Sequence, residues 1–208
     1  MRYSNKDAFN ESWLSEMPMG LGKVGDEFFH RLLETIQEFR AAGLEVVDLG
    51  NGYKRMSGDT VAFYWYEENN VILIAVELDI KPQSLVVRRT AKNPDIENND
   101  AHATDLYDVV LNDNYKSLRL MSDNQLSDKG YDLWKRLLTQ GKHISVYDAD
   151  NPGSTMRTLN SLEDMDEFFK FNDPIYKRWQ YVISENGAKL EETIQYFHTR
   201  RFLELSGL

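Results

Sequence analysis

Hydrophobic residues at helical spacing predict a long amphipathic helix in the first quarter of the chain. Asp26 can cap its first turn, and Gly43 follows its expected end at about Ala42. The apolar stripe of this helix consists of Phe28, Phe29, Leu32, Leu33, Ile36 and Phe39. Because the stripe is broad, we expect the helix to pack against the core of a domain.

Strand patterns dominate the segment that follows. Thr60–Glu67 is rich in aromatic and β-branched residues, Asn69-Asn70 is typical of a hairpin turn, and Val71–Ile80 alternates strictly. We expect the even-numbered side chains of Val71–Ile80 to form the buried face. Shorter strands are predicted at Leu44–Asp48, Tyr53–Met56 and Ser84–Thr90. The middle of the chain should therefore form an antiparallel meander.

A strand–helix–strand unit is predicted between Leu118 and Asp148, after a helix that begins at Thr104 or Asp105. Ser127 can cap the helix of this unit. Its apolar positions are Leu133, Trp134, Leu137 and Leu138, and Gly141 closes it. Such a unit usually contributes two strands to one sheet, with the helix packed across it.

Three more elements are expected after residue 150. They are a short acidic helix at Leu162–Phe171, a strand at Trp179–Ser184 and a closing helix at Ala188–Leu205. We therefore predict an N-terminal arm (1–24), a core domain (25–150) and a C-terminal helix–strand–helix extension packed on the core (151–208). The fold class is α/β (α+β), with a mixed sheet in a single domain, for which 208 residues suffice.

Composition narrows the classes of function. The chain has no cysteine, which excludes disulfides and thiolate chemistry and suits a reducing, cytoplasmic setting. It has no apolar run of membrane-spanning length and no signal-peptide core, so we expect neither a membrane partner nor secretion. The net charge is −10, and a nucleic-acid partner is not expected without a local basic patch. The four histidines share no metal-ligand spacing.

A family resemblance rests on residues of the predicted strand–helix–strand unit between Leu118 and Asp148. They are Ser122-Asp123, Leu126-Ser127, Gly130, Leu133-Trp134-Lys135, Leu137, Gly141 and Val146-Tyr147-Asp148. The pattern resembles GNAT-type N-acetyltransferase-like proteins encoded by tailed bacteriophages, over roughly residues 60–150. The resemblance implies a GNAT-like mixed sheet in which an antiparallel meander is followed by helix, strand, helix and strand. It also implies an acyl-CoA transferase body located in the host cytoplasm or the virion.

The resemblance implies positions for a coenzyme site. In this family the helix after the last meander strand holds the coenzyme A pyrophosphate at its N-terminus, where backbone N–H groups are unpaired. The corresponding cofactor-binding candidates for acetyl-CoA are Arg88, Arg89, Thr90 and Lys92. The chain departs from the family pattern because no glycine lies between Arg88 and Thr104.

The catalytic candidates implied by the resemblance are Glu77 or Asp79 as a base and Tyr131 as an acid. Trp134 stands where the family has a tyrosine, and an indole N–H is no useful acid at neutral pH. With the missing glycine, this departure makes us expect weak or lost catalysis, and whether the protein is an enzyme stays open.

A second interpretation is a Mg²⁺-dependent nuclease. Asp59 and Asp79-Ile80-Lys81 fit the Asp…(Asp/Glu)-x-Lys pattern of PD-(D/E)XK nucleases. With the hairpin turn near Asn69, Asp59 is expected opposite residue 79 or 80. The two carboxylates would hold Mg²⁺, and Lys81 would assist a nucleophilic water.

A third interpretation is an acidic interaction protein without catalysis, acting on a host factor or a virion protein. Five aromatic residues suit an interface and suit a core equally well: Tyr64, Trp65, Tyr66, Trp179 and Tyr181. This interpretation leaves a homo-oligomer open.

Overall fold

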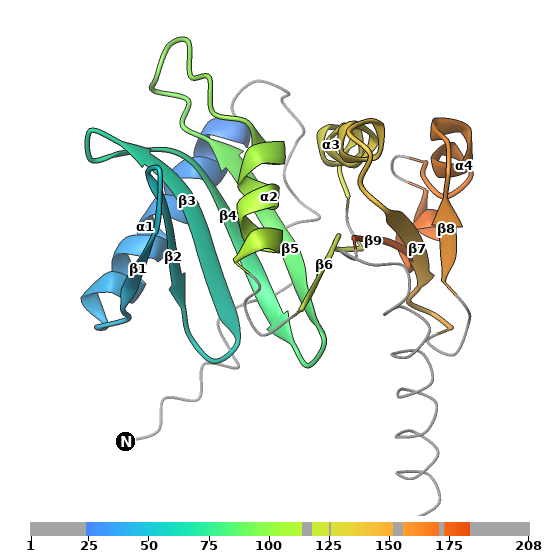
Figure 1. The fold of residues 1–208 in the computed structure, drawn as a ribbon, viewed down its shortest axis with the longest axis horizontal. Helices are drawn as coiled ribbons and strands as arrows, with labels where there is room; N and C mark the ends of the chain where they lie inside the picture. Colours follow the sequence, from blue (N-terminus) through green and yellow to red (C-terminus); the bar gives the residue numbers. More distant parts are fainter. Residues whose placement is uncertain (1–23, 114–117, 125, 152–155, 171–172, 184–208) are drawn as a thin grey trace, which may run out of the picture.

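A computed structural model describes residues 24–113, 118–124, 126–151, 156–170 and 173–183, and it contains one mixed sheet. The strands lie in the order β1-β2-β3-β4-β5-β6-β9-β7-β8 (Figure 1). They are β1 (Val46–Gly50), β2 (Tyr53–Ser57), β3 (Val61–Glu68), β4 (Val71–Lys81), β5 (Ser84–Lys92), β6 (Arg119–Met121), β7 (Ile144–Asp148), β8 (Arg157–Leu159) and β9 (Trp179–Ile183). The helices are α1 (Val24–Ala41), α2 (Ala103–Asn112), α3 (Asp128–Thr139) and α4 (Leu162–Asp166), with a 3-10 turn at Pro174–Arg178. The prediction of a mixed α/β fold is confirmed.

Strands β1 to β5 form the predicted antiparallel meander. Asn69 and Asn70 turn the β3–β4 hairpin with φ values of 50° and 62°, the left-handed conformation that a tight hairpin turn requires. Two irregularities interrupt the ladders. Leu73 of β4 is an extra residue opposite β3, and Arg88 of β5 is an extra residue opposite β4. Each bulge reverses which face of the sheet the following side chains reach.

The second half of the sheet begins with a parallel pair. The chain leaves β5, passes through α2 and returns as β6, whose residues Arg119–Met121 pair with Ser84–Val86 at the start of β5. Strand β9 then lies antiparallel between β6 and β7. The strands of the 118–148 unit therefore share one sheet, as predicted, but they are not neighbours.

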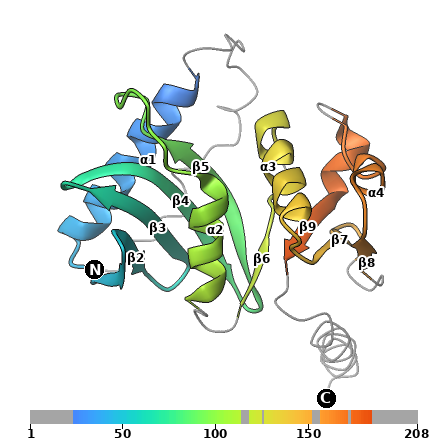
Figure 2. The same ribbon diagram turned by 45° about the horizontal axis from the view of Figure 1, so that its top comes forward.

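Helices cover both faces of the meander (Figures 1 and 2). On one face α1 packs Phe29, Leu32 and Ile36 against β-strand residues that include Phe63 and Trp65. On the other face α2 and α3 form the larger core with residues of β3, β4 and β9. The expectation that only the even-numbered face of β4 is buried is wrong, because α1 also buries Ala75 and Glu77 on the opposite face.

Helix α3 forms as its sequence predicts. The Ser127 side chain accepts a hydrogen bond from the Gly130 N–H at 3.1 Å, which satisfies one of the unpaired donors of the first turn. Trp134 and Leu137 are buried, and Gly141 follows the helix with φ +83°. Local spacing and capping are sufficient to specify this element.

Contrary to the prediction, the region after residue 150 is not a separate extension packed on the core, because part of it belongs to the central sheet. Strand β9 is an internal strand of the sheet, so residues 179–183 belong to the core and not to an appended layer. The acidic helix is shorter than expected, ending at Asp166, and strand β8 at Arg157–Leu159 was not predicted. The predicted arm at 1–24 (apart from Val24, the first residue of α1) and the helix at Ala188–Leu205 lie outside the described residues. None of the described helices has both the length and the apolarity needed to cross a membrane.

Candidate functional site

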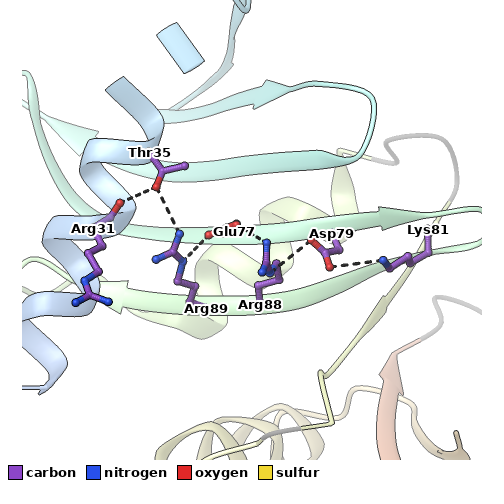
Figure 3. Close-up of polar contacts among 7 residues, drawn as sticks. All are labelled: Arg31, Thr35, Glu77, Asp79, Lys81, Arg88 and Arg89. Carbon is purple, nitrogen blue, oxygen red and sulfur yellow. Dashed lines mark hydrogen bonds and ion pairs between the residues drawn. The ribbon is translucent and has the colours of Figure 1, made fainter. Parts of the chain in front are cut away.

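The predicted base Glu77 is the centre of a charged cluster beneath α1 (Figure 3). Because Arg88 is the extra residue of the β5 bulge, both it and Arg89 reach Glu77. Arg89 Nε donates to Glu77 Oε2 at 2.5 Å, and Arg88 Nη1 donates to Oε1 at 3.3 Å. Arg89 Nη2 also lies 3.5 Å from Thr35 Oγ1 of α1. The cluster ties the helix to the sheet.

Asp79 extends this cluster toward solvent. Its two carboxylate oxygens lie 3.6 Å from Arg88 Nε and 3.6 Å from Lys81 Nζ. The side chain of Glu77 is only 4% exposed, whereas that of Arg88 is 43% exposed. The predicted catalytic carboxylates and the predicted phosphate-binding arginines therefore pair with one another.

Tyr131, the predicted acid, lies on the other face of the sheet. Its hydroxyl donates to Asp166 Oδ1 at 2.7 Å, and its ring stacks on Phe169 with centroids 3.9 Å apart. Burial, and then the hydrogen bond to Asp166, raise the pKa of the Tyr131 hydroxyl above its ordinary value. The structure does not bring Tyr131 together with Glu77, because α3 covers one face and α1 the other.

The other two cofactor-binding candidates, Thr90 and Lys92, lie at the C-terminal end of β5. The Thr90 hydroxyl lies 2.8 Å from the hydroxyl of Tyr107 on α2, and burial raises the pKa of Tyr107. Lys92 Nζ donates to the backbone carbonyl of Asn99 at 2.6 Å. Thr90 and Lys92 thus hold α2 and the preceding loop against the end of β5.

The loop between β5 and α2 folds without glycine. Asn98 adopts φ +55°, and the side-chain amides of Asn93 and Asn99 donate to the carbonyls of Ile72 and Leu73 at 2.9 and 2.7 Å. Asparagine is the residue that best replaces glycine in the left-handed conformation. The asparagine-rich composition therefore supplies the sharp turns for which the family resemblance led us to expect glycine.

This loop connects the end of β5, where one edge of the strand is unpaired, to the N-terminus of α2, which has no side-chain cap. Only Ser84–Val86 of β5 pair with β6, and among the described residues Val87–Lys92 have no strand neighbour on that side. We call Val87–Lys92 the open edge of β5; the ribbon shows β5 and β6 diverging there (Figures 1 and 2). At the start of α2, His102 has extended dihedral angles and makes no side-chain capping bond. Within the described ranges, backbone donors at both places thus lack a strand or side-chain cap partner.

The proposed nuclease residues are not assembled around a metal position. The bulge at Leu73 places Val61, not Asp59, opposite Asp79. Lys81 is bound to Asp79, and Asp59 is exposed in the β2–β3 turn. In the described ranges no group of three or more His, Cys, Asp or Glu side chains could hold a metal ion. The register prediction failed because a bulge has no signature in the alternation of β4.

Two clusters were missed from the sequence. On the α2 face, Asp113 Oδ2 accepts from Arg55 Nη1 at 2.6 Å and from the Tyr64 hydroxyl at 2.8 Å. Two turns earlier, Asp105 acts electrostatically on Tyr53, whose pKa is raised by burial and by this charge. The only sequence signal was the eight-residue spacing of the two aspartates, which places them on one side of a helix.

The five aromatic residues that could form an interface or a core differ in their burial. Tyr64, Trp65 and Tyr181 are buried, whereas Tyr66 and Trp179 are half-buried.

Comparison with protein-family models, with curated proteins and with solved structures finds no match for this chain.

Proposed function

We propose that this chain is an acyltransferase-like protein that binds an acyl-CoA at the open edge of β5 and the N-terminus of α2. The observation that carries the proposal is the divergence of β5 from β6 next to an uncapped helix start. The order of elements, an antiparallel meander followed by helix, strand, helix and strand, agrees with the resemblance to GNAT-type proteins.

The chemistry of the ligand matches these two features. A pyrophosphate is stabilised at a helix N-terminus by unpaired N–H groups and by the positive end of the helix dipole. The pantetheine arm of coenzyme A carries two amides, which can pair with an open strand edge as an additional strand does. Neither interaction needs the arginines, which are engaged by Glu77 and Asp79 on the α1 face.

Weak or lost catalysis is part of the proposal. Both oxygens of Glu77 accept hydrogen bonds from guanidinium groups, and Tyr131 is bound to Asp166 on the opposite face. We therefore propose that acyl-CoA binding serves an interaction with a host or virion protein, with slow acyl transfer at most.

Ala103→Pro tests the proposed anion site. Ala103 is the first residue of α2, where proline is tolerated, and His102 already has the extended dihedral angles that a following proline demands (φ −113°, ψ 137°). The substitution removes one donor with little effect on stability. Because a hydrogen bond to a charged group contributes about 1.5–3 kcal/mol, the affinity for acetyl-CoA should fall about tenfold or more by calorimetry.

Asp128→Pro is the matched control. It places proline at the first residue of α3, after the equally extended Ser127 (φ −78°, ψ 165°). Its affinity for acetyl-CoA should equal that of the unmodified protein. Saturation at 100 times the dissociation constant should also raise the free energy of unfolding by about 2.7 kcal/mol. No stabilisation by acetyl-CoA, or equal losses of affinity in both proline variants, would exclude the proposed site.

A further inference from the structure

The side of α2 that faces β2 carries two aspartates in different surroundings. Asp105 lies in the first turn of α2, and Asp113, eight residues later, directly follows its last residue, so the two lie on the same side at opposite ends of the helix. Asp113 contacts the cross-strand pair Arg55 and Tyr64, and the Arg55 guanidinium neutralises it. The Asp113 carboxylate therefore accepts hydrogen bonds from both a cation and an aromatic hydroxyl.

The next cross-strand pair on the same face is Tyr53 and Tyr66, which pack on the core that also holds Leu106 of α2. Asp105 precedes Leu106, and its charge acts on the Tyr53 hydroxyl, whose pKa is raised by burial and then by this charge. The two rings are 5.0 Å apart at an interplanar angle of 39°, and both are half-buried. Asp105 itself is exposed, and in the described part of the chain no cation pairs with it. This second position thus has a carboxylate and two aromatic rings but no guanidinium, whereas the first has a carboxylate, one aromatic ring and a guanidinium.

At two other places in this protein a guanidinium lies beside a carboxylate and one aromatic ring. Arg40 lies 4.9 Å from the ring centroid of Trp65 and 3.6 Å from Glu67. Arg178 lies 4.9 Å from the ring centroid of Trp179 and pairs with Asp148. An aromatic face attracts a cation within about 6 Å, and a planar guanidinium also stacks on the ring while it donates to a carboxylate.

The aromatic pair is held in a fixed position. Gly52 has φ +82°, and a Cβ atom there would lie 2.8 Å from Cε2 of Tyr66 and 2.6 Å from the carbonyl oxygen of Glu67. Tyr66 therefore packs directly on the backbone of the β1–β2 turn. A pre-positioned pair of rings loses little conformational freedom when a ligand binds.

We propose that Tyr53, Tyr66 and Asp105 form a binding site for the arginine side chain of a partner protein. The two rings lie over β2 and β3, which β4 separates from the open edge of β5, whereas Asp105 stands in the first turn of α2 beside the proposed pyrophosphate position. The proposal goes beyond the coenzyme site because its ligand is a cation of a partner protein, held by the rings and a carboxylate. The net charge of −10 favours the approach of a basic partner.

The test compares three short capped peptides that differ only at a central arginine, lysine or citrulline, titrated into the full chain without coenzyme. Citrulline keeps the shape of arginine but is neutral. The arginine peptide should bind at least about fivefold more tightly than the citrulline peptide, followed by NMR shifts of the Tyr53 and Tyr66 ring signals. Equal binding of arginine and citrulline peptides would overturn the proposal, as would tighter binding of lysine than of arginine.

Variants locate the interaction. Asp105→Asn should reduce the affinity for the arginine peptide to that of the citrulline peptide, whereas Asp128→Asn, an exposed acid in the first turn of α3, should leave it unchanged. Tyr66→Phe keeps the ring and should retain binding, whereas Tyr66→Leu should lose it. Equal effects of the two Asp→Asn variants would show non-specific attraction to an acidic protein and would overturn the assignment. Free guanidinium ion binding as tightly as the peptide would overturn the assignment to a protein partner.

Discussion

Glu77→Gln is the substitution whose effect follows most directly from the structure. It keeps the shape of the side chain, removes its charge and leaves one oxygen to accept from two guanidinium groups. The side chain is 4% exposed, and its contacts to Arg89 and Arg88 measure 2.5 and 3.3 Å. Removing one member of a buried ion pair costs about 3–5 kcal/mol, because the remaining charge is left without a partner in a poorly solvated place.

The expected loss for Glu77→Gln is smaller than that range. Arg88 and Arg89 are 43% and 25% exposed, so water solvates the guanidinium groups in part. We therefore expect the free energy of unfolding to fall by about 2–3 kcal/mol. Urea unfolding followed by circular dichroism at pH 7 measures this change, and the slope with denaturant should stay constant if only stability changes.

Asp79→Asn is the matched control for Glu77→Gln. Asp79 is 29% exposed and its ion-pair contacts are both 3.6 Å, so its loss should cost at most about 1 kcal/mol. Glu77→Gln combined with Arg89→Gln should destabilise less than the sum of the two single variants. A Glu77→Gln protein within about 0.5 kcal/mol of the unmodified one, or additive single effects, would refute our account of the cluster.

Two further predictions concern a turn and an acid-sensitive pair. Gly52→Ala should cost clearly more stability than Gly50→Ala: both glycines have positive φ (+82° and +85°), but only at Gly52 would the added Cβ meet backbone, 2.6 Å from the Glu67 carbonyl oxygen. Thermal unfolding of the two variants measures this difference, and equal costs would contradict the described packing. The Arg178 guanidinium holds the pKa of the Asp148 carboxyl below its usual range, so this pair stabilises the fold above the unfolded-state pKa of about 3.9 and the stabilisation is lost as the pH falls. Asp148→Asn should therefore be less stable near pH 7 and should show a shallower loss of stability on acidification below about pH 4, whereas an unchanged acid profile would count against the pair.

The positions of the candidate residues in the structure differ from those that the sequence predicts. The sequence predicts different roles for the carboxylates Glu77 and Asp79 and for the arginines Arg88 and Arg89. In the structure they form one cluster, because of a bulge in β5 that has no signal in the alternation pattern. The position of Tyr131 on a helix is predicted correctly, but the face of the sheet on which that helix packs depends on the whole crossover connection. The open edge of β5 could not be predicted, because it follows from how far β6 stays parallel to its neighbour.

Elements with local signals could be predicted from the amino-acid sequence: the apolar stripe of α1, the Ser127 cap of α3 and the Asn69-Asn70 turn of the β3–β4 hairpin. These depend on residues within a few positions of one another, so their signals can be read without knowing the fold. Three features became visible only in the folded chain: α1 buries the second face of β4, β9 lies in the sheet between β6 and β7, and Glu77 pairs with two arginines. Those outcomes depend on strand register and on contacts between residues far apart in the chain, where one bulged residue changes which side chains meet.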